Sequence, residues 1–129
     1  KAAVNSINNS HGNIYAELID VVSTPAQDIS GKISRASGIM VGSCTINRDA
    51  PKIIWDALSS IDAINSRGKP AGCFGSYGWS GEAVGMIQER LRSLGFKVSD
   101  EVVKVNFMPT DEDIRSIENY AHEIVSAIK

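Results

Sequence analysis

The sequence has little of what usually marks a membrane, nucleic-acid-binding or secreted protein. Its 129 residues carry a formal net charge of only −2, so it offers no electrostatic footprint for nucleic acid or an anionic membrane. No apolar run approaches the ~20 residues of a membrane span. The first residues, KAAV, are not followed by the apolar region of a secretion signal, although a mature secreted protein would have the same start. We expect a cytoplasmic protein that binds neither a membrane nor nucleic acid.

Several catalytic and metal-binding motifs are also absent. The two cysteines, Cys44 and Cys73, have neither CxxC nor zinc spacing, so two buried thiols are favoured over a disulfide. No loop carries the GxxxxGK[ST] sequence of a P-loop NTPase or the GxGxxG sequence of a dinucleotide site. The chain length fits one domain, residues 1–129, with a real hydrophobic core. Nothing in the sequence points to a catalytic acid, base or nucleophile.

Apolar segments and amphipathic segments alternate along the chain. Strands are predicted from β-branched and apolar runs, and helices from apolar residues at helical spacing. The predicted strands are 1–4, 14–22, 38–42, 71–75 and 102–108, and the predicted helices are 28–36, 51–64, 80–96 and 110 onward. This alternation indicates an open parallel sheet with helices on both faces, in which ligands bind beyond the carboxyl ends of the strands.

Local signals mark the ends of several predicted helices. Asp28 and Ser80 are candidate N-caps, and Gly95 between two apolar residues is a candidate C-cap. Residues 110–113 fit a capping box with aspartate at its acidic position.

Three loops that follow predicted strands share an unusual composition. They are NSINNSHGN at 5–13, SCTINRD at 43–49 and SYGWSGE at 76–82, all rich in small polar residues. Small polar side chains and free backbone N–H groups suit a phosphate or a polar heterocycle. The glycines allow close approach or positive φ, and Tyr77 and Trp79 offer flat faces for stacking. The alternative for Trp79 is a side chain that covers the end of the sheet.

Four segments resemble one known family. FGSYGWSGEAV at 74–84 is similar to the signature loop of the flavodoxin-like domain of flavodiiron proteins, also called A-type flavoproteins. IMVGSCTINR at 39–48 is similar to that family's third strand and flavin loop, with Cys44 where proline is common. LGFKV at 94–98 and VKVNFMPTDED at 103–113 match its closing strand and helix. The resemblance covers the chain from about Ile14 onward.

The resemblance implies a fold, a cofactor and a set of contacts. The implied fold is flavodoxin-like: an α/β, doubly wound, five-stranded parallel sheet of order 2-1-3-4-5, with FMN at the point where strand order reverses. Flavin contacts are implied at Ser43, Thr45, Ile46, Asn47, Ser76, Tyr77, Gly78, Trp79 and Gly81, and phosphate contacts at Ser10, Gly12 and Asn13. Arg48 would lie close enough to favour the reduced flavin, or would be a solvated charge for docking a partner.

Two departures from the family pattern stand out. Only about ten residues separate the strands predicted at 1–4 and 14–22, too few for a loop and a helix at ~1.5 Å per residue. Either the first helix is missing or, as we favour, the chain omits a segment of the natural protein. The only histidines are His11 and His122, and no HxExxDH run is present, so a diiron site is excluded from this chain.

The sequence therefore predicts an FMN-binding electron-transfer module, either a carrier or a domain of an oxidoreductase. Its expected partner is a redox protein or a diiron domain outside this chain, and a homo-oligomer is a further alternative. A second hypothesis is a flavodoxin-like interaction or structural module that has lost tight FMN binding.

Overall fold

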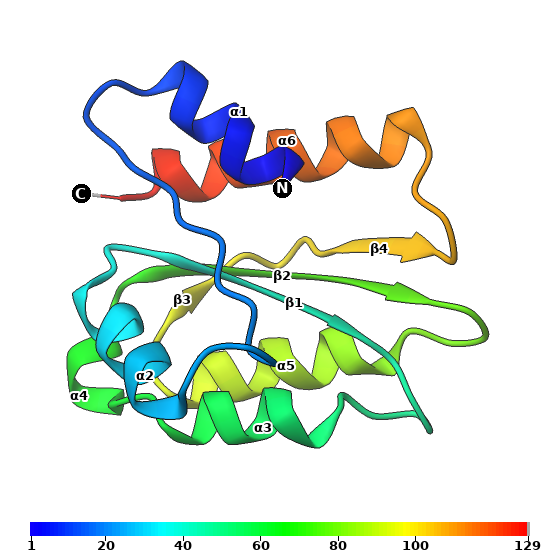
Figure 1. Ribbon diagram of the computed structural model, residues 1–129, viewed down its shortest axis with the longest axis horizontal. Coiled ribbons are helices and arrows are strands. Elements are labelled where there is room, and N and C mark those ends of the chain that lie inside the picture. Colours follow the sequence, from blue (N-terminus) through cyan, green and yellow to red (C-terminus); the bar gives the residue numbers. More distant parts are fainter. Residues whose placement is uncertain (129) are drawn as a thin grey trace.

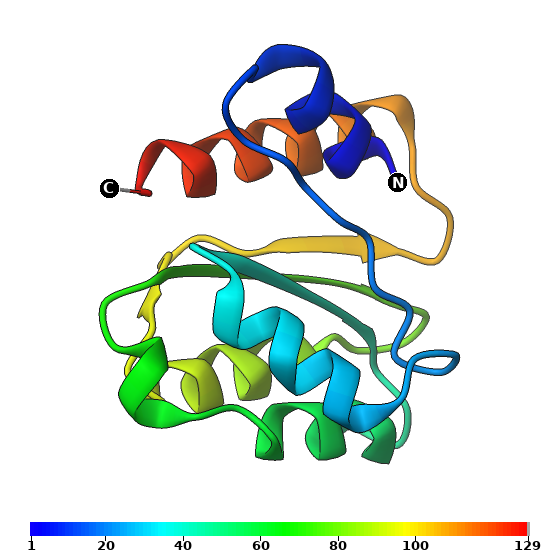
Figure 2. The same ribbon diagram turned by 60° about the vertical axis from the view of Figure 1, so that its left-hand side comes forward.

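A parallel sheet lies between two layers of helices in the computed structural model, which describes residues 1–128 (Figure 1). Helices cover both faces of the sheet (Figures 1 and 2). The first layer contains α1 (Ala2–Ser10) and α6 (Asp111–Ser126), and the second contains α2 (Ala26–Arg35), α3 (Lys52–Ser59), α4 (Ala63–Ser66) and α5 (Glu82–Ser93). The predicted α/β class and parallel sheet are confirmed.

Strand β2 (Pro70–Tyr77) forms the middle of the sheet. It pairs in parallel with β1 (Ile39–Cys44) on one side. On its other side it pairs in parallel with β3 (Lys97–Val98) and then with β4 (Val103–Asn106). Residues 1–128 thus form four strands, and the predicted five-stranded order 2-1-3-4-5 is not confirmed.

The strand predicted at residues 1–4 is wrong, because these residues open helix α1. Alanines at positions 2 and 3 are strong helix formers, and Ile7 is buried where α1 packs on α6. A helix therefore precedes residues 14–22, which contradicts the alternative in which the first helix is missing; the favoured alternative, an omitted segment, stays a prediction.

The strand predicted at residues 14–22 is wrong as well. This segment runs from α1 to α2 across the sheet without pairing (Figure 1). The Tyr15 side chain within it is 81% exposed. A β-branched and aromatic sequence favours a strand only where a neighbouring strand and a packed face are available. Since β1 pairs only with β2, its outer edge has no strand beside it within residues 1–128.

Helix ends follow the local signals in two of four cases. Gly95 has φ of +94°, and the Phe96 N–H donates to the Leu91 carbonyl, which makes a Schellman C-cap as predicted. Thr110 and Asp113 form the predicted capping box. Asp28 and Ser80 are not N-caps: α2 follows Pro25 and α5 follows Gly81, neither with a side-chain cap.

Tyr120 of α6 joins the helix to the region between β3 and β4. Its hydroxyl accepts a hydrogen bond from the Cys73 N–H at 3.1 Å and donates one to the Glu101 carbonyl at 2.8 Å. A side chain at residue 72 would clash with this ring, so Gly72 is what lets Tyr120 reach the sheet. Burial raises the pKa of the Tyr120 hydroxyl.

The two cysteines are both free thiols, in line with the favoured alternative. Cys73 lies in the core between the sheet and α5, and burial raises the pKa of its thiol to about 12. Cys44 is exposed at the end of β1, so the expectation of two buried thiols is wrong for this residue. Among the described helices, none is long and apolar enough to cross a bilayer.

Candidate functional site

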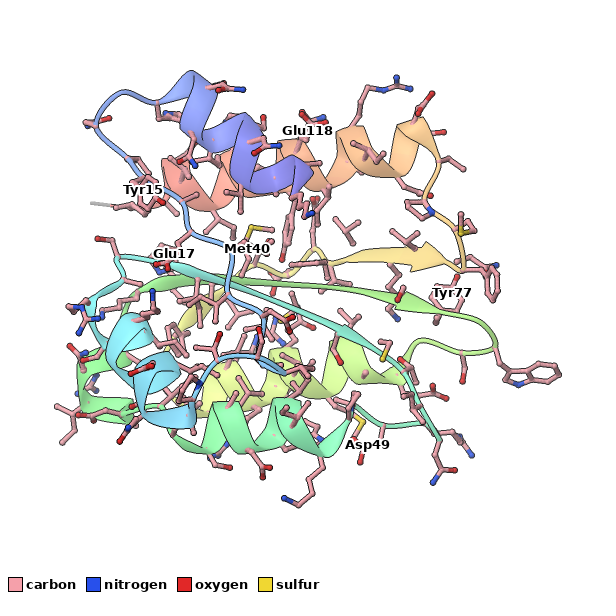
Figure 3. All side chains as sticks on the ribbon, viewed as in Figure 1. Tyr15, Glu17, Met40, Asp49, Tyr77 and Glu118 are labelled. Atoms are coloured by element: carbon pink, nitrogen blue, oxygen red, sulfur yellow. The ribbon has the colours of Figure 1, made fainter. Side chains whose placement is uncertain are left out.

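The candidate site lies where the carboxyl ends of β1, β2 and β4 meet, at the right-hand end of Figure 1. Ser43, Ser76 and Tyr77 lie within the last two residues of their strands and are not loop residues. Their alignment is set by the register of the sheet, in which Ser43 faces Gly75 across the β1–β2 pair. Figure 3 shows Tyr77 and Asp49 at this end, while Tyr15 lies at the opposite one.

The first loop is a tight turn over residues 46–49. The Ile46 N–H donates to the Asp49 carbonyl at 2.8 Å, and the Asp49 N–H donates to the Ile46 carbonyl at 3.1 Å. Its two central residues, Asn47 and Arg48, have φ of 54° and 63°. Asparagine tolerates this left-handed conformation, whereas arginine carries strain in it. The turn presents both side chains at the end of the sheet.

The second loop, residues 78–81, holds the most exposed aromatic side chain of the described residues. Trp79 is 97% exposed, so it does not cover the end of the sheet. The N–H groups of Gly78 and Trp79 donate to no other described residue. They are available to a ligand with acceptor atoms.

Close backbone approach occurs at only one of the glycines in this stretch. A Cβ at residue 75 would lie 2.4 Å from the Ser43 carbonyl oxygen and 2.6 Å from Val84. Gly78 and Gly81 do not have positive φ, and a Cβ at Gly78 would meet only Phe107, at 3.8 Å. Glycine at position 75 is therefore required by the packing of neighbouring strands. At position 78 the missing side chain leaves open space.

The two loops are tied together beneath a small hollow. Thr45 Oγ1 accepts a hydrogen bond from the Ala83 N–H at 3.2 Å, and the Thr45 N–H donates to the Ser76 carbonyl at 3.3 Å. The hollow has a volume of about 230 Å³ and is lined by Thr45, Asn47, Arg48, Trp79 and Ser80. Sites for whole small molecules usually measure ~300–1,000 Å³, so this hollow suits one part of a larger ligand.

An ion pair joins the turn at 46–49 to the start of α5. Arg48 Nε lies 3.4 Å from Glu82 Oε1, the first residue of α5. The Ser80 hydroxyl, the backbone N–H of Glu82 and the Arg48 guanidinium together lower the pKa of the Glu82 carboxyl. This carboxylate complements the positive end of the α5 dipole and repels a second anion there. The start of α5 is therefore unsuited to a phosphate.

Ser10, Gly12 and Asn13 are not brought to this end of the sheet. Ser10 ends helix α1, and Gly12 and Asn13 follow that helix, so their predicted position in a loop after the first strand is wrong. Their neighbour His11 contacts His122 near the end of α6, and residues 10–13 lie at the left of Figure 1, opposite the strand ends. The residues predicted after β1 and β2 do come together.

The contact between the two histidines was not predicted from the sequence. His11 Nε2 lies 3.0 Å from His122 Nδ1, and Ser6 Oγ lies 2.8 Å from His122 Nε2. These contacts fasten α1 to α6 and make no site with a third metal-ligating side chain. Among the described residues, no three of His, Cys, Asp and Glu are grouped to hold a metal. Sequence separations of 111 and 116 residues gave no local signal of the pairing.

The family model described as flavodoxin matches residues 13–120. This chain belongs to the flavodoxin family. Flavo-diiron protein FprA2 of Clostridium acetobutylicum is 36% identical over 87% of this chain, and putative diflavin flavoprotein A 2 of Thermosynechococcus vestitus is 34% identical over 90%. Flavodiiron proteins are thus among the similar relatives, as the sequence resemblance predicted.

Solved structures give the same result. Rubredoxin oxygen:oxidoreductase from Desulfovibrio gigas matches with a TM-score of 0.90 and 28% identity, over 98% of this chain and 31% of that chain. A flavodoxin from the domain Archaea matches with a TM-score of 0.82 and 28% identity, over 98% of this chain and 85% of that chain. The chain spans 28% and 20% of the two curated relatives, so it corresponds to one module of those larger proteins.

Proposed function

We propose that this flavodoxin-family chain binds FMN and relays electrons, as the flavodoxin module of a flavodiiron protein. The observation that carries the proposal is the pair of loops at the strand ends, which combines free N–H groups, the exposed Trp79 and a hollow of about 230 Å³. These features fit the isoalloxazine ring, a flat heterocycle with acceptor atoms on one edge. The proposed ring contacts are Ser43, Thr45, Ile46, Asn47, Ser76, Tyr77, Gly78, Trp79 and Gly81.

The phosphate of FMN finds weaker support. Glu82 occupies the start of α5, and Ser10, Gly12 and Asn13 lie at the other end of the sheet. The residues of this chain therefore orient and stack the ring, and we propose no phosphate contact from the described residues. When bound, the flavin supplies the one- and two-electron chemistry, while the protein sets its potential through hydrogen bonds, stacking and charge.

The proposed partner is a diiron domain or another redox protein outside this chain. Relatives that are named flavo-diiron proteins extend well beyond the matched module. Trp79 is exposed beside the proposed ring site. Its side chain would contact the flavin or a docked partner protein. Electron transfer needs no acid, base or nucleophile from this chain.

Flavin titration with a visible absorption spectrum tests the proposal. We expect a yellow complex, and we expect riboflavin to bind within about threefold of FMN, because the described residues offer no phosphate site. Trp79→Ala should lower the affinity for both flavins by up to ~10-fold, since a stacked aromatic pair contributes ~0.5–1.5 kcal/mol beyond area burial. Tyr15→Ala is the control, because Tyr15 is an exposed aromatic side chain at the opposite end of the sheet (Figure 3).

One observation favours the second candidate function, a module without tight flavin binding. The carboxyl end of the sheet has no loop after a further strand beside β1 within residues 1–128. A colourless protein that binds neither flavin at millimolar concentration would overturn the first proposal and leave the interaction module.

A further inference from the structure

We propose that Phe107, in the loop after β4, is a third aromatic wall of the flavin site and positions the isoalloxazine ring against residues 76–81. The inference rests on the proposed function and extends it to a strand end for which no cofactor contact was predicted.

The first observation is the backbone of Phe107. Its φ is +60°, and the only other non-glycine residues with positive φ among those described are Asn47 and Arg48. All three follow the carboxyl end of a strand, and two of them border the hollow. A bulky residue in the left-handed region is a strained exception, and such strain gathers at binding sites.

The second observation is what holds this conformation. The Phe107 N–H donates to the Tyr77 carbonyl at 2.8 Å, so the backbone of the third loop is fastened to the start of the second. A Cβ placed on Gly78 would lie 3.8 Å from Cδ2 of the Phe107 ring. The ring therefore lies beside Gly78, next to the space that a side chain at residue 78 would occupy.

The third observation is exposure. The Phe107 side chain is 77% exposed, although it is a large apolar group on a strained backbone. A polar residue or a glycine would suit the same position better in an empty loop. A flat ligand that stacks beside Tyr77 would cover the ring and recover the free energy of burying it.

Four variants separate the ring from the backbone. Phe107→Gly and Phe107→Asn both tolerate φ of +60° and keep the N–H that bonds to Tyr77. Phe107→Tyr keeps an aromatic wall. Met108→Ala is the control, because Met108 is an exposed apolar neighbour that the proposal leaves outside the ring site.

The experiment titrates riboflavin and FMN into each variant and follows the flavin fluorescence. We expect Phe107→Gly and Phe107→Asn to bind both flavins ~3- to 10-fold more weakly and to quench their fluorescence less, at unfolding midpoints in urea no lower than that of the parent. Phe107→Tyr should restore affinity and quenching, and Met108→Ala should match the parent.

Three outcomes overturn the inference. Parent-like affinity and quenching in the Gly and Asn variants would make Phe107 a surface residue for another protein. Weak binding that accompanies a lower unfolding midpoint and is not restored by Phe107→Tyr would make its role structural. A parent that binds no flavin would overturn the proposed function and this inference together, whereas the first two outcomes leave the proposed function intact.

Discussion

Arg48 brings backbone strain and charge together at one residue. It occupies the second central position of the turn at 46–49, where φ is +63°, and its guanidinium pairs with Glu82 at the start of α5. Two-residue turns with positive φ at both central positions prefer Asn followed by Gly. Asn47 follows that preference and Arg48 does not. The Arg48 side chain therefore occupies a position where the backbone conformation favours glycine.

Replacing Arg48 by glycine and by alanine separates these two roles. Both variants lose the ion pair, but only alanine keeps a Cβ in the left-handed region. We expect the free energy of unfolding of Arg48→Gly to be about 1 kcal/mol higher than that of Arg48→Ala. Urea denaturation at pH 7 measures both. Equal stabilities would mean that the turn relaxes to negative φ without Arg48.

The two thiols should differ sharply in reactivity and in their effect on stability. The pKa of Cys73 is raised to about 12 from an ordinary value of 9.0, chiefly because burial disfavours the thiolate. The folded state therefore holds its proton while the unfolded chain loses it, so this contribution to stability is complete below pH 9.0 and declines as the pH rises toward 12.

Urea unfolding at rising alkaline pH checks this expectation. Cys73→Ala should lose less stability above about pH 9 than Cys44→Ala, whose thiol is exposed. With a thiol-specific reagent at neutral pH, Cys44 should react in the native protein and Cys73 only after unfolding. Fast labelling of Cys73 in the native state would contradict its place in the core.

At the scale of elements, Tyr120 shows how a helix supports an interrupted sheet edge. Between β3 and β4 the chain leaves the ladder, and the Tyr120 hydroxyl takes over hydrogen bonds from Cys73 and to Glu101. We expect Tyr120→Phe to lower the free energy of unfolding by about 1–3 kcal/mol, because it leaves two backbone groups without a partner. Tyr15→Phe, on an exposed side chain, should be neutral by the same measurement.

Elements were predictable where the deciding signal is local. The Schellman cap at Gly95 and the capping box at 110–113 depend on a few adjacent residues, and the sequence indicated both. The 14–22 segment has a strand composition, yet a strand needs a neighbour, and neighbours are set by the rest of the fold. Residues 1–4 were mistaken for a strand because four apolar or charged residues do not show helical spacing.

The candidate site was predictable to the same extent. The loops after β1 and β2 were found from composition and from their resemblance to a family motif. Phe107 was not found, since an aromatic after a strand is an ordinary pattern and its positive φ is visible only in the structure. The segment at 5–13 has the right composition for a phosphate, but residues 5–10 belong to α1, and the position of α1 on α6 takes residues 10–13 to the far end of the sheet.

At the scale of the whole molecule, the outer edge of β1 remains open. Along Ile39–Cys44, the backbone N–H and C=O groups that do not point toward β2 face this edge, with no strand beside them in residues 1–128. No proline and no charged side chain lies within this strand to discourage pairing. Such unpaired edges can form backbone hydrogen bonds with the same edge of a second molecule.

The measurable result is a threshold protein concentration for association. Above it, chains should associate edge to edge, and amide hydrogens of residues 39–44 should exchange more slowly, while those of α6 keep their rates. Hydrogen exchange and sedimentation across a hundredfold dilution check this, and identical exchange of β1 at both extremes would contradict it. Below this threshold, flavin titrations report on single chains. Above it, association changes the surroundings of the Ser43 end of β1, so the apparent flavin affinity would depend on protein concentration.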